Sequence, residues 1–321
     1  MTEQLVSIRQ MRDADLEQAD KIMRLSFGTY LGLPDPMQFM GDADYVKTRF
    51  NADPSGALVA EDSSGKIVGS NFAMNWGSVG VFGPLTTHPD TWDKGFAKQL
   101  LEETMKIFSR WGSRHLGLFT FAQSAKHVHL YQKFGFWPRY LTAVMYRNLS
   151  GSSQKNQKYY ARLLSQLSQT EKENATEKCR QLSNQIFEGL DLRKEIRSVD
   201  VQKLGDTVLM LDSGDNLAGF AICHTGAGTE AGTGNCYVKF GAVNRDDSSG
   251  QLFSGLLDCV QEFALSKQTA RLVAGVNMAR HGAYKIMIER GFRTELQGVA
   301  MHSPNAPGYN LPDIYLIDDW R

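Results

Sequence analysis

Leu85-Thr86-Thr87-His88-Pro89-Asp90-Thr91-Trp92-Asp93-Lys94-Gly95-Phe96-Ala97 is the most informative segment of this chain, because it joins the end of a β-rich run to the start of an amphipathic helix. A strand that passes through a glycine-containing turn into a helix predicts an anion site, since unpaired backbone N–H groups and the positive end of the helix dipole meet there. A pyrophosphate would fit this site. The segment lacks both the G-x-G-x-x-G dinucleotide motif and the G-K-[ST] ending of a phosphate-binding loop. A plain strand-to-helix connection, for which one glycine is adequate, remains the alternative.

The residues around this segment alternate between strand and helix patterns. Apolar and polar positions with strand character, bounded by turn residues, predict strands at 5–10, 56–61, 67–77, 78–87, 115–121 and 141–147. Apolar residues at helical spacing fill three of the gaps, after the first strand and on both sides of 115–121. The predicted fold class is therefore α/β, more closely α+β, with a mixed sheet.

Length and composition narrow the class of protein. The chain has 321 residues, of which 42% are hydrophobic and 22% charged, and this length predicts two domains with ordinary cores. Thirty-five Lys and Arg balance 35 Asp and Glu, which disfavours nucleic acid and membrane partners. Four widely spaced cysteines and seven scattered histidines predict reduced thiols and no metal site. A charged N-terminus, without an apolar run of ~18 residues, predicts a cytoplasmic protein.

The second half of the chain repeats the pattern of the first. Residues 151–182 are rich in Gln, Ser, Lys and Glu, so we place a domain boundary near Gly151 and expect domains at 1–150 and 151–321. An offset of 156 residues aligns the halves over about sixty residues without a gap and brings Gly135-Phe136 onto Gly291-Phe292. The sequence therefore predicts two tandem copies of one fold.

The element order and the segment at 85–97 together resemble the GNAT (GCN5-related) superfamily of N-acetyltransferases. Members of that family end their fourth strand with Val-x-Pro, open the next helix with an [RQ]-x-x-G-x-[GA] pyrophosphate loop and later carry Leu-Tyr-x-x-x-Gly-Phe. The third element is matched in full by Leu130-Tyr131-Gln132-Lys133-Phe134-Gly135-Phe136. The strand-end and loop positions are held by Thr87, Pro89, Trp92, Gly95 and Ala97. Trp92 stands where the family has Arg or Gln, and the resemblance covers about residues 5–147.

The resemblance implies two tandem GNAT-like acyl-CoA N-acyltransferase domains, an acetyl-CoA co-substrate and no metal. The backbone of Leu85, Thr86 and Thr87 would pair with the pantetheine arm and hold the thioester carbonyl. Tyr131 would protonate the departing sulfur, although a buried core tyrosine is the alternative. Further cofactor contacts are expected at Trp92, Asp93, Lys94, Gly95, Phe96, Ala97 and Ser124. The carboxylate of Asp93 opposes phosphate binding there.

The acceptor and the general base stay open. In the family, the loop that begins at Phe27 and Tyr30 lines the acceptor site, and hydrophobic anchoring of this loop is the alternative. The acceptor is expected to be a small-molecule or peptide amine. No Asp or Glu lies between Asp62 and Asp90. The candidates for the base are therefore ordered water, His88, Glu61 and the group Asp318, Asp319 and Arg321.

The second copy departs from the family at the positions that the site needs. The offset places Tyr131 on Met287, Gly95 on Gln251, Ala97 on Phe253 and Pro89 on Arg245. Met287 cannot donate a proton, and Phe253 puts a ring where backbone should approach a phosphate. We therefore expect a degenerate copy with a structural or substrate-shaping role. A surface for homodimer formation is the alternative.

Two functions of different classes follow from these observations. The first is acetyl-CoA-dependent acetylation of an unidentified primary amine by the N-terminal domain, through direct transfer. The second is a non-catalytic acyl-CoA-binding or interaction protein, which Trp92, Asp93 and the missing strand carboxylate would suit. Fold analogy favours the enzyme only as a prior.

Overall fold

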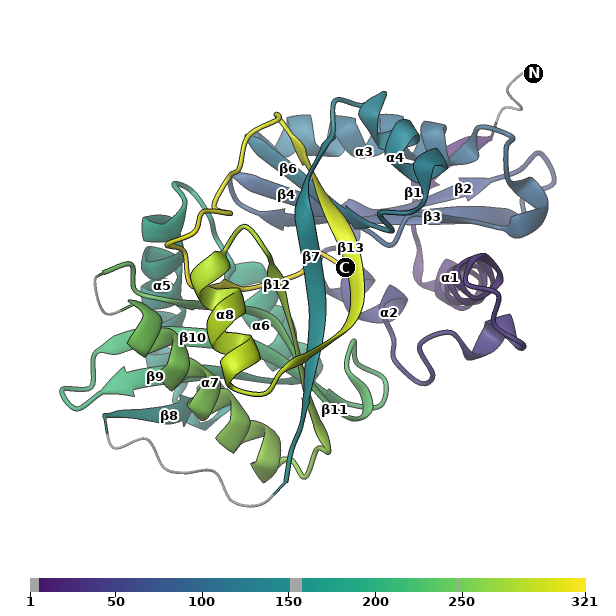
Figure 1. The fold of residues 1–321 in the computed structure, drawn as a ribbon. Coiled ribbons are helices and arrows are strands. Elements are labelled where there is room, and N and C mark those ends of the chain that lie inside the picture. Colours follow the sequence, from purple (N-terminus) through teal and green to yellow (C-terminus); the bar gives the residue numbers. More distant parts are fainter. Residues whose placement is uncertain (1–5, 151–157, 247–248) are drawn as a thin grey trace.

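The structure, a computed structural model, describes residues 6–150, 158–246 and 249–321 (Figure 1). Its first half has the predicted order of strands and helices, with one additional short helix, α2, and with the strand predicted at 78–87 divided into β4 and β5. The strands of this half are β1 (Ser7–Gln10), β2 (Ala57–Glu61), β3 (Ile67–Trp76), β4 (Val79–Phe82), β5 (Thr86–Thr87), β6 (His115–Thr120) and β7 (Trp137–Asn148). The helices are α1 (Leu16–Tyr30), α2 (Val46–Ala52), α3 (Phe96–Trp111) and α4 (Ala125–Gln132).

The second half repeats this arrangement. Its strands are β8 (Tyr159–Leu163), β9 (Gly205–Asp212), β10 (Leu217–Gly226), β11 (Gly232–Val243), β12 (Arg271–Asn277), β13 (Arg293–Ser303) and β14 (Leu316–Ile317). Its helices are α5 (Gln169–Ile186), α6 (Arg193–Gln202), α7 (Ser249–Ser266) and α8 (His281–Glu289). β12, α8 and β13 each begin 156 residues after β6, α4 and β7, so the structure has the predicted repeat. Gly151, where we place the domain boundary, lies outside the described residues.

The two copies share one sheet, and β7 of the first copy and β13 of the second lie at the junction between them. The strand order is β1-β2-β3-β4-β6-β13-β7-β12-β11-β10-β9-β8. Counted from either edge toward the centre, the strands of each copy follow the same order. β13 pairs with β6 of the first copy, and β7 pairs with β12 of the second. β7 and β13 also pair with each other along most of their length, and they run side by side through the centre of the molecule (Figure 1).

The hydrophobic core is also continuous across the junction. In the first half, α3 and α4 cover one face of the sheet, and α1 and α2 cover the other. Trp76 and Val81 from the first half pack in one cluster with Ile196 of α6 and Phe240 of β11. Because burial of apolar area is the main favourable term in folding, this shared cluster couples the stability of the two halves.

The structure also bears on the cysteines and on membrane-spanning helices. All four cysteines are buried and free, which confirms the prediction of reduced thiols. Among the described residues, none of the helices is long and apolar enough to cross a membrane.

Candidate active site

The first half contains an opening between two parallel strands. β4 and β6 pair only from Val79 and His115 to Val81 and Gly117. Beyond this point the chain of β4 continues as β5, which stays with β3, whereas β6 follows β13 on its other side. The two strands therefore separate, and their polar backbone edges face each other across the opening.

A β-bulge lies where the opening begins. Phe82 is opposite Ala73 of β3, and Thr86 is opposite Ser70. Three residues, 83 to 85, thus face only two on β3, which is the definition of a bulge. Gly83 has a φ of 147°, a backbone region that side chains rarely adopt.

The backbone of β5 presents alternate groups to the opening. The His88 N–H donates to Val68 O at 2.8 Å, and alternate residues of an antiparallel strand bond to the same neighbour. The main-chain groups of Leu85 and Thr87 are therefore directed away from β3. Leu85 and Thr87 could therefore pair with a pantetheine arm, whereas the main chain of Thr86, for which the same pairing is expected, is turned toward β3.

The segment after β5 forms the predicted turn into a helix. Gly95 is the N-cap of α3, with a φ of 85° that favours glycine. A glycine cap leaves the N–H groups of the first turn available to an anion. Trp92 folds back on the strand, and its Nε1 donates to Thr87 O at 3.1 Å. Phe96 points into the core and Ala97 is half-buried, so these two residues offer backbone to a ligand.

The negative charge of Asp93 has a partner. Lys126 of α4 lies 2.6 Å from Asp93 Oδ1, so an ion pair bridges the loop and the helix beside it. Lys94 next to it is exposed, whereas Ser124 is buried at the N-cap of α4. The negative charge near the N-terminus of α3 therefore repels a phosphate less than the sequence alone predicts.

Tyr131 lies beside the opening. Its ring contacts that of Phe82, at the end of β4, with centroids 5.8 Å apart. Its hydroxyl bonds to the side chain of Thr120, at the end of β6. Burial raises the pKa of Tyr131 above its ordinary value, so the phenol is protonated at neutral pH. Tyr131 is both a buried residue and a neighbour of both separating strands.

Phe27 and Tyr30 lie in the last turn of α1 and not in the predicted loop, and they belong to an aromatic cluster at the C-terminal end of β6. Tyr30 stacks on Phe121, with ring centroids 5.1 Å apart, and also contacts His127. Phe27 stacks on Phe39 at 5.1 Å and contacts Phe121 edge-on. The structure therefore brings the two expected substrate contacts next to the strand that borders the opening.

The candidates for the base lie on different elements, and Arg321 is linked to Gly83 of the bulge because Arg49 donates to the main-chain oxygens of both residues. Glu61 pairs with Arg9 at 2.6 Å, and the Nδ1 of His88 accepts a bond from the N–H of Asp90. Asp318 pairs with Arg280 at 2.7 Å. Asp319 is buried, accepts a bond of 3.0 Å from Tyr237 Oη and lies 3.2 Å from Arg321 Nε. Burial raises the pKa of the Asp319 carboxyl.

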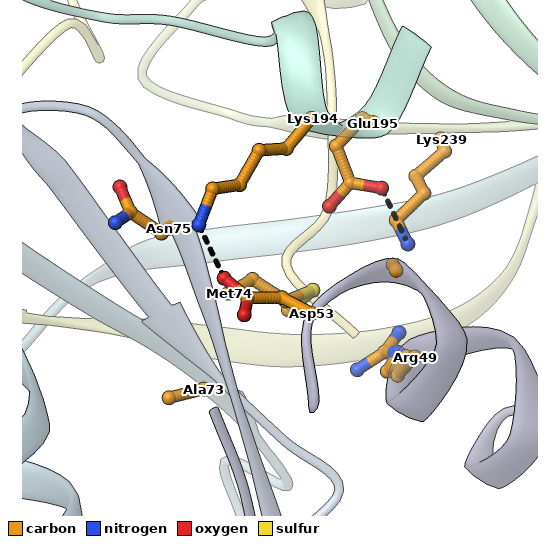
Figure 2. Close-up of a pocket in the computed structure, with 9 residues that line it drawn as sticks. Arg49, Asp53, Ala73, Met74, Asn75, Lys194, Glu195 and Lys239 are labelled. Atoms are coloured by element: carbon orange, nitrogen blue, oxygen red, sulfur yellow. Dashed lines mark hydrogen bonds and ion pairs between the residues drawn. The ribbon is translucent and has the colours of Figure 1, made fainter. Parts of the chain in front are cut away.

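A buried ionic cluster, which the sequence analysis missed, joins the bulge to the second half. Glu230 accepts two bonds from Arg49 of α2, at 3.1 and 3.0 Å, and one from Lys239 at 2.8 Å. Lys239 also pairs with Glu195 at 3.1 Å. Arg49, Glu195 and Lys239 line a small cavity of about 10 Å³. Lys194 and Asp53, which also line it, form an ion pair (Figure 2). Arg49 and Glu230 are 181 residues apart, so no local sequence pattern could predict that they pair.

The corresponding opening in the second half is occupied by the chain itself. β11 and β12 pair only as far as Val238 and Ala274, and β14 pairs with β11 just beyond, at Gly241 and Ala242. We call residues 312–320 the plug segment. Its Tyr315 lies against Gly250 and Gly282, at the starts of α7 and α8. Asp318 holds Arg280, at the N-cap of α8.

Part of the sequence matches a known protein family, and solved structures share the fold. Residues 21–136 match the family model described as Acetyltransferase (GNAT) family. No curated protein matched the sequence. A putative acetyltransferase from Pyrococcus horikoshii superposes with a TM-score of 0.68 at 14% identity, covering 98% of this chain and 95% of that one. A GCN5-related N-acetyltransferase from Sphaerobacter thermophilus gives 0.59 at 13% identity, with 93% and 95% covered.

A tandem GNAT protein from the clavulanic acid biosynthesis pathway is similar in the same way, with a TM-score of 0.58, 11% identity, and 93% of this chain and 98% of that chain covered. Together with the family match, these likenesses define the class: a mixed α/β protein with the GNAT fold. Residues 21–136 thus match the GNAT acetyltransferase family, and the chain as a whole has the fold of tandem GNAT structures.

Proposed function

We propose that the first half transfers an acetyl group from acetyl-CoA to a primary amine by direct attack. The observation that carries the proposal is the opening between β5 and β6, which has the free N-terminus of α3 at one end and Tyr131 at its side. An elongated thioester with a pyrophosphate needs this combination of an extended backbone edge and an anion site. Fold and family alone support only the general acetyltransferase class.

The pyrophosphate would lie on the first turn of α3, against backbone from Gly95 to Ala97. Trp92 would fix the loop through its bond to Thr87, and the pairing of Asp93 with Lys126 lowers the repulsion of the phosphates. The pantetheine arm would pair with the main chain of Leu85 and Thr87. Lys94 and Ser124 would border the arm and the phosphates from the loop and from α4.

Transfer requires that a C–N bond forms as the C–S bond breaks. The neutral amine attacks the thioester carbon, and backbone N–H groups beside the bulge stabilise the charge that develops on oxygen. Tyr131 would donate its proton to the departing thiolate and regain one from solvent. The amine's own proton goes to ordered water or to one of the carboxylates named above.

The acceptor would lie against the aromatic cluster around Tyr30 and Phe121. Planar rings supply contact area at low entropic cost, so an amine that carries an apolar body would fit. A small molecule and a peptide N-terminus both meet this description.

For the second half we propose that the opening binds no cofactor. The plug segment pairs with the β11 edge that a pantetheine arm would need, and Phe253, in the second turn of α7, is buried in the core. One acetyl-CoA should therefore bind per chain.

Calorimetric titration of acetyl-CoA into the full chain tests the cofactor site. Ala97→Phe places in the first copy the ring that the second copy already carries, and it should abolish binding. Lys106→Phe makes the same change on the exposed face of α3 and should leave binding intact. We expect micromolar affinity and a stoichiometry of one for the wild type. Failure of the wild type to bind would favour a non-catalytic interaction protein.

The reaction is then tested by release of free thiol from acetyl-CoA in the presence of single amines. The panel should contain polyamines, amino acids, amine-bearing antibiotics and short peptides with free N-termini. Acceleration by one class would support the transferase. Saturable binding without transfer to any of them would contradict it.

A further inference from the structure

We propose that Arg49 is a positioning residue of the transfer site, held in place by Glu230 of the second copy. The inference rests on the proposed function and deepens it. It assigns the second copy a specific task, which is to fix the strand bulge that orients the thioester carbonyl.

The geometry at the bulge carries the first step. Arg49 Nη1 donates to the main-chain oxygen of Gly83 at 2.6 Å. On its other side, the Gly83 N–H donates to Phe72 O at 2.9 Å. Both main-chain groups of Gly83 are therefore bonded, one to the sheet and the other to a side chain that arrives from α2.

The direction of the neighbouring N–H groups depends on this contact. Pro84 has no N–H, so Leu85 carries the first donor after Gly83. The Gly83 carbonyl belongs to the peptide unit just before Pro84, and its orientation sets the path of the chain into Leu85. A charged donor makes the stronger kind of hydrogen bond. Arg49 thus restrains the segment whose N–H groups would meet the carbonyl oxygen.

Arg49 is in turn held by the second copy. Its side chain is 1% exposed and that of Glu230 is 0% exposed, and a buried charge is tolerated only with a partner. Glu230 receives both Nε and Nη2 of Arg49 in a bidentate arrangement. Nη2 also donates to a main-chain oxygen of Arg321. All the acceptors except Gly83 therefore lie in the second half.

The charges around the pair are balanced. Lys239 bonds to both Glu230 and Glu195, and Trp76 Nε1 donates to Glu195 at 2.9 Å. Two cations and two anions thus alternate from α2 to α6. Desolvation alone would raise the pKa of Glu230, but Arg49 and Lys239 hold it below its ordinary value. Glu230 is therefore a permanent anion over the working pH range, as a fixed anchor must be.

The test measures the carbonyl directly and needs no acceptor. Acetyl-CoA labelled with ¹³C at the thioester carbonyl is bound to the full chain, and its C=O stretch is recorded by infrared difference spectroscopy. Hydrogen bonds from the bulge should shift the band to lower wavenumber in the wild type. In Arg49→Lys the shift should be lost while calorimetric affinity for acetyl-CoA persists, because the α3 anion site is untouched.

Two further variants keep the result interpretable. Arg49→Gln with Glu230→Gln removes both buried charges together, which avoids an unpaired ion if Arg49→Lys fails to fold. It should also lose the shift. Lys194→Met removes the ion pair with Asp53, which links the same two halves at the rim of the same cavity (Figure 2). It should keep the shift, since Lys194 does not touch Gly83.

The outcomes separate the two proposals. A wild type that does not bind acetyl-CoA contradicts the proposed function. Binding with a band that is the same in the wild type and in both Arg49 variants overturns the role of Arg49 and leaves the cofactor site standing. A shift lost equally in Lys194→Met would show a general loosening of the junction and would also overturn it.

Discussion

The indole Nε1 of Trp92 donates a 3.1 Å hydrogen bond to the main-chain oxygen of Thr87, so the side chain that departs from the family motif fastens the loop to the strand it follows. Its loss should loosen the pyrophosphate turn. Trp92→Phe removes the donor and keeps a ring, at a cost of about 0.5–1.5 kcal/mol for one hydrogen bond. We expect acetyl-CoA to bind about 2- to 10-fold more weakly in calorimetry. Tighter binding would mean that Trp92 obstructs the site.

Tyr131→Phe should slow transfer without changing acetyl-CoA affinity. The variant keeps the packing against Phe82 and loses only the hydroxyl that bonds to Thr120. General acid catalysis is worth roughly 10²–10⁴ in rate, so single-turnover transfer should fall by about that factor. Tyr284→Phe, on α8 of the second copy, is the matched control and should be neutral. An unchanged rate in Tyr131→Phe would remove Tyr131 from the mechanism.

Asp318→Asn should destabilise the protein far more than Asp313→Asn. Asp318 pairs with Arg280, and both side chains are almost fully buried, so neutralising the aspartate leaves a cation without its charge partner. We expect a loss of about 3 kcal/mol in the free energy of unfolding. Asp313 forms an exposed pair with Arg245, which is worth at most about 1 kcal/mol. Urea titration compares the two variants, and equal losses would contradict this account of the plug segment.

Acidification should weaken the junction through a buried histidine pair. His115 Nε2 and His302 Nδ1 are 2.9 Å apart, on β6 and β13. Burial lowers the pKa of His115 to about 4 and, with His115 nearby, that of His302 to about 3. Because the unfolded chain takes up protons near the ordinary value of about 6.5, stability is fully present above this pH.

As the pH falls from about 6.5 toward 4, the unfolded state binds more protons than the folded state, and the free energy of unfolding decreases. Between about pH 6.5 and 4.5, a loss on the order of 3 kcal/mol is expected for each histidine. The measurement is urea unfolding of the wild type and of His302→Gln at about pH 7.0 and about pH 4.5, one above and one below the ordinary histidine pKa of about 6.5. The variant should lose less stability over this interval; a larger loss than in the wild type would refute the role of the pair.

Much of the fold could be predicted from local patterns. The alternation of strands and helices, the turn at Gly95 and the repeat at an offset of 156 residues all lie in contiguous sequence, and the structure has each of them. The loop from Trp92 to Ala97 follows from the same segments, whereas the contact of Tyr131 with Phe82 could be seen only in the structure. The likeness to known GNAT structures confirms the predicted class and its tandem organisation.

The exchange of β7 and β13 could not be predicted in this way. Each strand has the same alternating pattern whether it pairs within its own copy or with the other, because period-two patterning specifies a face and not a partner. The same limit applies to the plug segment, whose pairing with β11 spans about 75 residues of chain between Gly241 and Ile317. The partner of such a strand depends on which strand edges of the sheet remain unpaired after both copies have formed.

The sequence by itself determined the fold class, the duplicated order of its elements and the glycine turn that begins α3, since each depends on neighbours a few positions away. Only the tertiary structure decided that Asp93 is neutralised by Lys126, that Asp318 fastens the plug segment and that Arg49 reaches Gly83 with Glu230 behind it. The physical reason is that charge pairing depends on distance in space and on burial, and both arise only when segments far apart in the chain are packed together.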